Sequence, residues 1–336
     1  MRTIKVGSDF SGVGAFDYAI GRVAKKKGFN VQNIYACDMD KYARISYIEN
    51  HGEPQYYPKD VYERDIPDQS LDLYMTSPPC QAFSLSGKRL GKKDKRGILF
   101  FNSHEFIKKN KPRFFIFENV KGLLSDDSGR TFSEWINMLG GKSINGLPIL
   151  FPYMDSVAYH VYWKVLNSKE HGVPQNRERI FIIGIRDDQD NDFKFPVEEL
   201  LTNRLKDILE SEVDKKYFLT DEMMSKIMID TCRVKSATAH GYEIATDDDS
   251  INFSVPNSDT RRGRVGKGVA QTLDTQCNQG IFEGHKIRRF TPRECFRLQD
   301  FPDSFKFVVS DSQLYKQAGN SITVRVLEKI ITNLSL

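Results

Sequence analysis

Apolar residues follow two different rhythms along the chain as far as Arg186. Short, continuous apolar runs of the kind found in buried strands occupy residues 3–6, 33–37, 71–76, 114–118, 161–167 and 179–185. Between these runs, apolar residues recur at helical spacing over residues 15–27, 40–50 and 132–139. Strands that alternate with helices predict an α/β fold with a doubly wound, Rossmann-like parallel sheet.

The alternation breaks after Arg186, where the acidic run DDQDND resembles a linker. Apolar runs then become shorter, and Gly, Asn and Asp become frequent until about residue 285. A dense segment, IRRFTPRECFRLQDFPDSF, follows and leads into a C-terminal helix whose apolar positions Ile322, Val326, Ile330 and Leu334 recur every four residues. The expected divisions are therefore a main domain at 1–186, a smaller irregular domain at 187–285, and a segment at 286–336 that packs back on the main domain.

Length and cysteine usage narrow the class of protein. The chain has 336 residues, enough for one large and one modest domain. Its apolar runs all fall well short of the roughly 20 residues that span a bilayer, so we expect no membrane partner, a cytoplasmic or nucleoid-associated location, and a monomer. The five cysteines are scattered without a C-x-x-C pair, and the sequence therefore predicts neither a metal site nor a disulfide framework.

Basic residues gather in two loops that contain glycine, although the net charge is only +4. KRLGKKDKR, at 88–96, holds six basic residues and one acid, and RRGR lies at 261–264. Such loops suit phosphate binding, while a solvated surface is the simpler interpretation of either loop alone. The candidate nucleic-acid contacts in the two loops are Lys88, Arg89, Lys92, Lys93, Arg96, Arg261, Arg262 and Arg264.

The Gly-rich turn SDFSGVGAF, between the first strand and helix, can bring backbone amides close to a ligand. A dinucleotide fingerprint would need glycine at position 17, where the chain has Asp17, and this disfavours a nicotinamide-dependent oxidoreductase. Asp38 ends the second strand, where its carboxylate can accept hydrogen bonds from ribose hydroxyls. The pattern favours an adenosine ligand without a pyrophosphate, although a merely tight turn is an alternative.

Cys80 lies in SPPCQAFSLSG, directly after the strand at 71–76. Open α/β sheets bind ligands at the carboxyl ends of their strands. A lone cysteine is usually buried filler, but two prolines and a Gly- and Lys-rich loop favour a nucleophile here. Glu118 ends another apolar strand, where an unpaired carboxyl would be costly. In QNRER, Arg177 and Arg179 would point to one side of the sheet if the segment is extended, and could meet a carboxylate or a base carbonyl.

These segments together resemble the bacterial DNA (cytosine-5) methyltransferases. The matching pieces occur in the order usual for that family: DFSGVGAF, ACDMDKYA, PPCQAFS, ENV, QNRER, RRFTPRECFRLQDFP and QAGNSI. A single piece could match by chance, but six or more in order are highly specific. The resemblance implies a transferase that moves a methyl group from S-adenosyl-L-methionine to carbon 5 of a cytosine flipped out of double-stranded DNA.

The resemblance also implies a role for each catalytic residue. Cys80 would add to carbon 6 of the cytosine ring. Glu118 would grip the cytosine edge, and Arg179 would hold the ring carbonyl oxygen. Arg177 would orient Glu118, and Asn119 would brace the catalytic loop. The sequence assigns no base to the removal of the proton at carbon 5.

The implied cofactor site is assembled from several segments. Asp38 would hold the ribose, although the family usually has Glu there, and Met39 stands where an aromatic residue often covers the adenine. Asp300 replaces a common glycine. The remaining residues would line the turn, meet the adenine, support the catalytic turn or close the pocket: Phe10, Gly12, Gly14, Asp60, Val61, Pro79, Asn320 and Ser321.

The resemblance assigns DNA contacts to two regions. The loop from Gln81 to about Phe101, which includes Ser84, would close over DNA. Thr272 and Leu273 resemble the Thr-Leu pair of a target-recognition region, so 187–285 would choose the DNA sequence. The resemblance also implies an enzyme that is part of, or related to, a restriction–modification system. Two alternative functions stay open. The first is the tRNA-methylating branch of the family, whose Cys-Phe-Thr stretch has no match in TCRV of this chain. The second is a catalytically silent DNA-binding homologue, which should lack Cys80 or Glu118, although both are present here.

Overall fold

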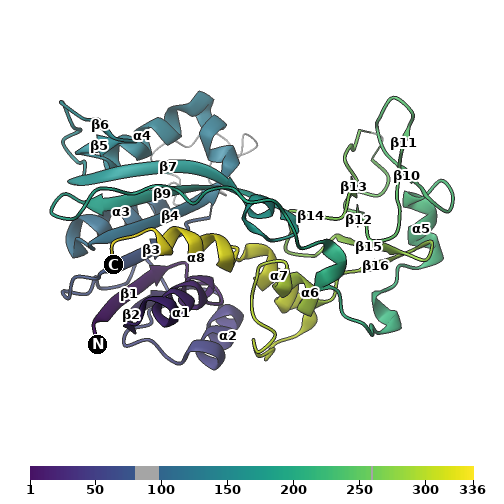
Figure 1. Cartoon of the computed structure of the whole chain (residues 1–336), viewed down its shortest axis with the longest axis horizontal. Coiled ribbons are helices and arrows are strands. Elements are labelled where there is room, and N and C mark those ends of the chain that lie inside the picture. Colours follow the sequence, from purple (N-terminus) through teal and green to yellow (C-terminus); the bar gives the residue numbers. More distant parts are fainter. Residues whose placement is uncertain (80–97, 259) are drawn as a thin grey trace. The chain divides into compact units, whose positions relative to one another are not determined.

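The computed structural model describes residues 1–79, 98–258 and 260–336, which form two compact units (Figure 1). The first unit comprises residues 1–166, 178–197 and 327–336. The second comprises residues 167–177 and 198–326. The chain thus passes between the units several times, and residues 286–326 belong with 198–285. The functional division expected at residues 187 and 285 stays a prediction.

An eight-stranded sheet in the order β2-β1-β3-β4-β9-β7-β5-β6 forms the centre of the first unit. Its strands are β1 (Thr3–Asp9), β2 (Asn30–Cys37), β3 (Leu73–Thr76), β4 (Phe114–Val120), β5 (Ser143–Ile144), β6 (Leu147–Pro148), β7 (Tyr159–Asn167) and β9 (Glu178–Arg186). The helices that accompany it are α1 (Ala15–Lys27), α2 (Lys41–His51), α3 (Ile98–Asn110), α4 (Arg130–Leu139) and α8 (Val324–Thr332). The predicted α/β fold is confirmed, and α3 and the β5–β6 hairpin are additions to it.

The expectation of an entirely parallel sheet is wrong for β9. Strands β2, β1, β3 and β4 pair in parallel, as predicted. Strand β9 pairs antiparallel with β4. The physical reason is the short connection from β7, which contains a 3-10 turn (Ser168–His171) and strand β8 (Gln175–Asn176) but no α-helix. Parallel neighbours need a long crossover, usually helical, and this segment does not supply one.

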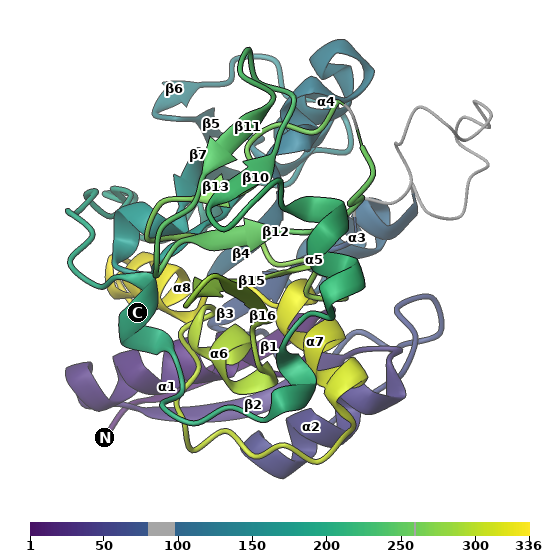
Figure 2. The same ribbon diagram turned by 90° about the vertical axis from the view of Figure 1, so that its right-hand side faces the viewer.

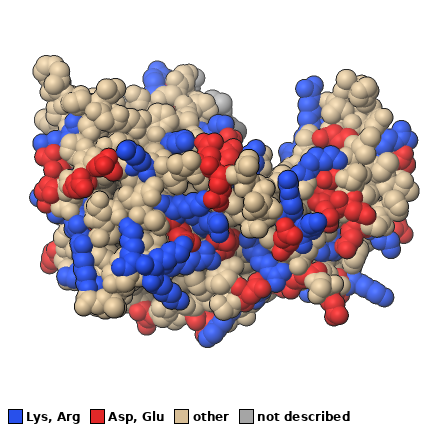
Figure 3. Space-filling view, viewed as in Figure 1, with Lys and Arg blue, Asp and Glu red and all other residues tan. Residues whose placement is uncertain are grey.

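Helices cover both faces of the sheet, as Figures 1 and 2 show: α1 and α8 on one face, α3 and α4 on the other. Glu328 of α8 forms ion pairs with Arg22 and Lys26 of α1. On the other face, the ring of Phe106 from α3 stacks on Tyr74 with centroids 4.2 Å apart. Lys and Arg side chains gather over α1 and α8 on the face drawn in Figure 3. The residues of these two helices belong to neither of the predicted DNA-binding loops, 88–96 and 261–264.

Among its described residues, the second unit is built from short strands, the α-helices α5, α6 and α7, and short 3-10 helices. Its largest sheet is four-stranded, in the order β13-β12-β15-β16, and two-stranded sheets pair β10 with β11 and β14 with β8. The strands are β10 (Arg233–Lys235), β11 (Tyr242–Ile244), β12 (Ser250–Asn252), β13 (Val265–Gly266), β14 (Ala270–Gln271), β15 (Gln279–Glu283) and β16 (Lys286–Arg289). The helices are α5 (Asp221–Ile227), α6 (Pro292–Arg297) and α7 (Asp311–Asn320). A small apolar core supports this unit, including Ile251, Phe282 and Ile287.

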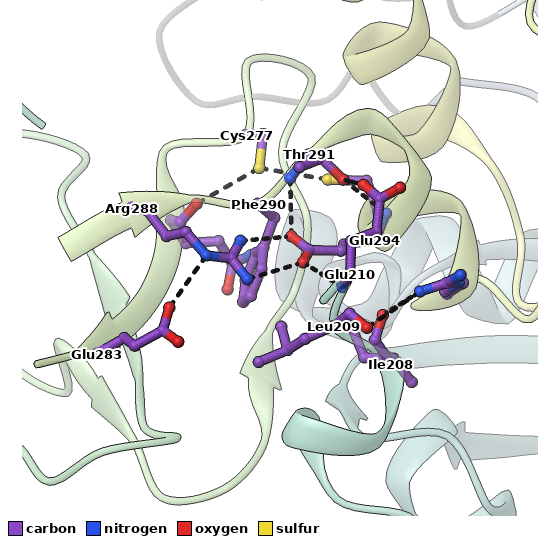
Figure 4. Close-up of polar contacts among 12 residues, drawn as sticks. Ile208, Leu209, Glu210, Cys277, Glu283, Arg288, Phe290, Thr291 and Glu294 are labelled. Atoms are coloured by element: carbon purple, nitrogen blue, oxygen red, sulfur yellow. Dashed lines mark hydrogen bonds and ion pairs between the residues drawn. The ribbon is translucent and has the colours of Figure 1, made fainter. Parts of the chain in front are cut away.

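A buried ion pair joins β16 to α6 in the second unit (Figure 4). Arg288 Nη1 and Nη2 each lie 2.9 Å from a carboxylate oxygen of Glu294. Glu294 also accepts the backbone N–H of Thr291, 2.9 Å away, and so closes the capping box at the start of α6. Its other oxygen accepts the backbone N–H of Glu210 at 2.9 Å. The carboxylate of Glu294 therefore joins β16, the start of α6 and the backbone at residue 210 through hydrogen bonds.

Asp300, which stands where the related family often has glycine, has a φ of 60°. That is the left-handed region, which glycine enters freely and aspartate tolerates better than most residues. Its backbone N–H donates to the carbonyl oxygen of Arg297 at 2.9 Å. Asp300 therefore adopts a conformation that a glycine at this position would enter freely. In the ranges described, every helix is too short or too polar to cross a bilayer.

Candidate active site

The predicted catalytic and cofactor residues of the first unit follow the carboxyl ends of adjacent strands. Strand β1 leads into Phe10, β2 into Asp38, and β3 into Pro78-Pro79, while Glu118 lies near the end of β4. Because β2, β1, β3 and β4 are parallel neighbours, these ends share one edge of the sheet. This is the edge at which open α/β sheets bind their ligands.

Glu118 and Arg179 form an ion pair on two neighbouring strands, with Arg179 Nε 3.2 Å from Glu118 Oε1. In the antiparallel register Val120 faces Arg179, which makes Glu118 and Arg179 a diagonal pair on one face. Their side chains are 9% and 16% exposed. The partner lowers the cost of placing a carboxyl at the end of a buried strand, and both groups still reach the surface where a ring could contact them.

Asn119 is the neighbour of Glu118 and is 3% exposed. Its Nδ2 donates to the carbonyl oxygen of Pro78 at 3.0 Å, and its Oδ1 accepts the backbone N–H of Val120 at 2.8 Å. Pro78 precedes Cys80 by two residues. Asn119 therefore has the contact that its predicted bracing role requires, and its effect on catalysis stays a prediction.

The predicted nucleophile and one of the two basic loops lie outside the described residues. These are Cys80 with Ser84, Lys88, Arg89, Lys92, Lys93 and Arg96. Cys37, a thiol at the end of β2, is described and is 1% exposed. Burial raises the pKa of Cys37 to about 12, so it remains a protonated and unreactive thiol at neutral pH.

The Gly-rich turn is tied to Asp38 by backbone amides. Asp38 Oδ2 accepts the N–H of Gly12 and Oδ1 accepts the N–H of Asp40, each at 2.8 Å. Burial raises the pKa of Asp38, and these two amides partly oppose that rise. Each oxygen keeps a lone pair that could accept a ribose hydroxyl.

Two glycines of this turn have different reasons to be glycine. Both have positive φ, 54° at Gly12 and 82° at Gly14. A Cβ at Gly14 would lie 2.2 Å from Nε2 of His51, whereas no atom lies within 4 Å of a Cβ at Gly12. Gly14 therefore permits close packing, and Gly12 faces open space into which a ligand fits. Phe10, at the start of the turn, also has a left-handed φ of 56°.

The residues expected around the adenine differ in exposure. Met39 is 81% exposed although it is apolar, as a side chain that covers a bound ring would be. Val61 is buried, and the Oδ1 of half-buried Asp60 accepts the N–H of Tyr62 at 2.9 Å. Pro79 is exposed. Open space at Gly12, acceptor capacity at Asp38 and exposed Met39 fit an adenosine group.

QNRER is not one strand, which corrects the expectation for Arg177 and Arg179. Residues 175–176 form β8, which pairs with β14 in the second unit, and β9 begins at Glu178. Between these strands, Arg177 is 3% exposed. Its guanidinium donates to the carbonyl oxygens of Leu273 at 3.4 Å, Gly319 at 3.1 Å and Ser321 at 2.6 Å. Its predicted action on Glu118 stays a prediction.

These contacts of Arg177 join several predicted residues of the second unit. They bring QNRER together with the segments that contain Thr272 and Asn320. Thr272 is exposed, and its Oγ1 donates to the Asn176 carbonyl oxygen at 2.8 Å. Asn320 is exposed and Ser321 is buried. Their closing of the cofactor pocket stays a prediction.

The arginines of the RRGR loop differ sharply from one another. Arg262 is exposed and Arg261 is half-buried, whereas Arg264 is fully buried at 0%. The Arg264 guanidinium donates to four carbonyl oxygens of residues 252–256, at distances from 2.9 to 3.4 Å. Burial, together with the charge of Arg261, lowers the pKa of Arg264. Its predicted DNA contact stays a prediction, while the observed hydrogen-bond partners of its guanidinium are all backbone carbonyl groups.

The sequence interpretation missed a buried charged cluster beside the cofactor turn. Asp9 accepts hydrogen bonds from Arg64, with Nη2 at 2.7 Å and Nε at 3.2 Å, and from the hydroxyls of Tyr74, at 2.6 Å, and Tyr35. Arg64 Nη1 donates to the carbonyl oxygen of Val61 at 2.7 Å. A carboxyl at the end of an apolar strand was the available signal for Asp9, as it was for Glu118.

Solved structures of methyltransferases share this fold. The crystal structure of the Dnmt2 methyltransferase of S. pombe superposes with a TM-score of 0.66 at 20% identity, covering 98% of this chain and 97% of that one. A putative DNA modification methyltransferase encoded within an E. coli prophage gives a TM-score of 0.65 at 21% identity, covering 98% of both chains. The chain therefore shares the α/β fold of these methyltransferases.

Sequence comparison identifies the family. The model of the family described as "C-5 cytosine-specific DNA methylase" matches residues 4–336 of this chain. The type II methyltransferase M.SsoII of Shigella sonnei is 36% identical over 330 residues, which cover 95% of this chain and 80% of that protein. M.HaeII of Haemophilus aegyptius, also a type II methyltransferase, is 34% identical over 333 residues, covering 98% and 92%. The chain belongs to the C-5 cytosine-specific DNA methylase family, as its motifs predicted, and the oxidoreductase alternative is overturned.

The brace at Asn119 can be tested by truncation. Asn119→Ala leaves the buried Pro78 carbonyl without this donor and frees the turn that precedes Cys80. We expect kcat for methyl transfer to fall on the order of 10-fold, because a lost buried hydrogen bond costs roughly 1–3 kcal/mol. The affinity for S-adenosylmethionine should change little. Steady-state kinetics with each substrate varied in turn would measure both.

A matched control is Asn137→Ala, which removes an amide that donates to the carbonyl oxygen of Ser133 at 2.7 Å in an exposed hydrogen bond of α4. This variant should retain the wild-type kcat. An Asn119→Ala enzyme that also retains it, with an unchanged melting temperature, would contradict the bracing role.

Proposed function

We propose that this enzyme is a sequence-specific DNA methyltransferase that methylates carbon 5 of a flipped cytosine in duplex DNA through a covalent bond to Cys80. The observation that carries the proposal is the Glu118–Arg179 pair on β4 and β9, with Asn119 joined to the turn that leads to Cys80. A carboxyl and a guanidinium on one face of the sheet can act on one pyrimidine ring. The family membership supports the same reaction.

Carbon 5 of cytosine is a weak nucleophile until a thiolate adds to carbon 6. Cys80 must be deprotonated for this addition. The new carbon–sulfur bond pushes electron density to ring nitrogen 3 and to carbon 5, which then attacks a methyl group. When bound, S-adenosylmethionine supplies that methyl group from its sulfonium. A base then takes the proton from carbon 5, and the Cys80 thiolate leaves as the ring double bond returns.

Glu118 and Arg179 would stabilise the addition step. The Glu118 carboxyl would donate a proton or hydrogen bond to ring nitrogen 3, where negative charge develops. The Arg179 guanidinium would hold the ring carbonyl oxygen. Their diagonal placement lets both groups address one planar edge. Each ring atom is inaccessible within a stacked duplex, so the base must first be flipped out.

S-adenosylmethionine would be held at the shared strand edge of the first unit. Asp38 would accept the ribose hydroxyls, and Asp60 would meet the adenine, which Met39 would cover. The open space before Gly12 and the acceptor capacity of Asp38 support this assignment. The further residues proposed to line or close the pocket are Phe10, Gly14, Val61, Pro79, Asn320 and Ser321.

DNA recognition would use the segment 187–285, and the most accessible base reader in RRGR is Arg262. Guanine is the base that arginine reads most often. The type II methyltransferases among the relatives support a modification role beside a restriction endonuclease. A monomer acting on duplex DNA is the simplest assembly for this reaction.

Cys80→Ala tests the reaction itself. Bisulfite sequencing of DNA from cells that express the wild-type chain should reveal methylated cytosines in one sequence context, and Cys80→Ala should abolish them. Duplex DNA with 5-fluorocytosine at the target should trap only the wild type as a denaturation-resistant adduct. Fluorine takes the place of the hydrogen at carbon 5, so no proton can be removed there and the Cys80 thiolate cannot leave. If Cys80→Ala still forms that adduct, Cys80 is not the nucleophile.

The protonation state of Asp38 should make cofactor binding depend on pH. The carboxylate is the form that accepts two ribose hydroxyls, and its pKa is raised above the ordinary value. Affinity for S-adenosylmethionine should therefore decline on acidification at a higher pH than an exposed aspartate would cause. Asp38→Asn should bind roughly 10-fold more weakly at pH 7 and lack this decline. Calorimetry from pH 7 downwards, with folding checked by circular dichroism, would measure it; parallel curves for both proteins would refute the assignment.

Arg262 and Arg264 should separate recognition from folding. Arg262→Ala should preserve the melting temperature and weaken discrimination against one-base variants of the target by roughly 1–3 kcal/mol. Arg264→Ala should lower the free energy of unfolding by about 2–3 kcal/mol, because buried carbonyl groups lose a charged donor. Methylation assays on target and variant duplexes, with urea denaturation, test both. Unchanged target choice in Arg262→Ala would remove it as a base reader.

A further inference from the structure

Arg44 of α2 lies between the two backbone segments assigned to the adenosine half of the methyl donor. Its Nη2 donates to the carbonyl oxygen of Tyr57, and its Nη1 to that of Pro58, each at 2.8 Å. The same Nη1 lies 3.4 Å from the carbonyl oxygen of Asp38. One guanidinium therefore joins the end of β2 to the segment that leads into Asp60.

The orientation of this guanidinium is itself constrained. Its Cζ lies 3.7 Å from the centroid of the Tyr57 ring, which is a cation–π contact. Tyr57 is 9% exposed and packs against Tyr47, with ring centroids 5.2 Å apart. A planar fork stacked on a fixed ring can address two adjacent carbonyl oxygens at once, which the ammonium group of lysine cannot do with the same geometry.

The Asp60 segment has little regular structure to hold it. A β-bridge pairs Tyr56 with Tyr35, residues 57–60 have no regular secondary structure, and a turn follows at 61–63. Beyond Asp60, the carbonyl oxygen of Val61 accepts from Arg64 Nη1 at 2.7 Å. Asp60 thus lies between carbonyls held by Arg44 on one side and a carbonyl held by Arg64 on the other.

We propose that Arg44 is a positioning residue that sets the spacing between Asp38 and Asp60, and thereby the recognition of adenine and ribose as one unit. This inference rests on the proposed binding of S-adenosylmethionine at these residues. Arg44 directs its N–H groups to backbone carbonyls, so it acts through the two aspartates. The same spacing suits an adenosine group and should matter less for a nucleoside that Asp60 cannot recognise.

The test compares two ligands in the absence of DNA. S-adenosylhomocysteine carries the adenine amino group, and S-inosylhomocysteine has a carbonyl oxygen in its place. Wild type should prefer the adenine ligand on the order of 10-fold, because the Asp60 carboxylate loses its hydrogen-bond donor in the inosine ligand. Arg44→Ala should bind S-adenosylhomocysteine on the order of 10-fold more weakly and lose most of that preference. Arg44→Lys should fall between the two.

The control is Lys41→Ala, which removes an exposed cation from the same helix. It should match wild type for both ligands. With S-adenosylmethionine saturating, kcat of Arg44→Lys should stay within about twofold of wild type while KM for S-adenosylmethionine rises, since positioning acts on cofactor binding.

The outcomes separate this inference from the function on which it rests. Loss of the preference for adenine in Arg44→Lys or Arg44→Ala supports the positioning role. Equal weakening of both ligands, with the preference unchanged, overturns it and leaves a purely structural arginine. If Arg44→Ala does not fold, the preference measured for Arg44→Lys decides. A wild-type protein that binds neither ligand would instead overturn the proposed cofactor site.

Discussion

The buried ion pair of Asp9 and Arg64 constrains the whole ligand edge of the first unit. Asp9 is 1% exposed and lies at the end of β1, the strand beside which β2 and β3 pair. Arg64 brings the charge that balances it and also donates to the backbone of Val61 and, at 3.1 Å, of Asn102 in α3. Removing one partner of such a pair typically costs about 3–5 kcal/mol, because the other charge is left buried. The pair therefore selects one arrangement of strand, turn and helix.

Strand β4 shows how two adjacent residues divide the chemistry of the edge. Side chains alternate between the faces of a strand, so Glu118 and Asn119 point in opposite directions. Glu118 meets Arg179 of β9, and Asn119 meets the carbonyl oxygen of Pro78. Helix α3 is attached nearby through Ser103, whose Oγ lies 2.7 Å from the Oγ1 of Thr76 at the end of β3. The proposed nucleophile thus follows a turn that is held by the same strand as the group proposed to grip the cytosine.

Arginine has several functions in this protein, and some of the described arginines are buried. Arg64, Arg177 and Arg264 are buried, and each donates to backbone carbonyl oxygens. A guanidinium carries five N–H donors in a rigid fork, which suits it to collecting carbonyls from segments without regular structure. Basic residues counted along the chain are therefore a poor measure of DNA-contacting surface. In the second unit, the exposed Arg262 and the fully buried Arg264 are only two positions apart.

The sequence alone determined the α/β fold, the helix at 15–27 and the strands β1 to β4, β7 and β9, because burial imposes a periodicity that is visible locally. It also determined the family, through segments such as PPCQ and ENV whose residue types the chemistry requires. The direction of β9 and the break of QNRER at Arg177 were decided by tertiary structure, since both depend on which distant segments supply hydrogen-bond partners. The roles of Asp9, Arg44 and Arg264 were decided in the same way: a charged residue has the same appearance in the sequence whether water, DNA or a buried carbonyl oxygen satisfies it.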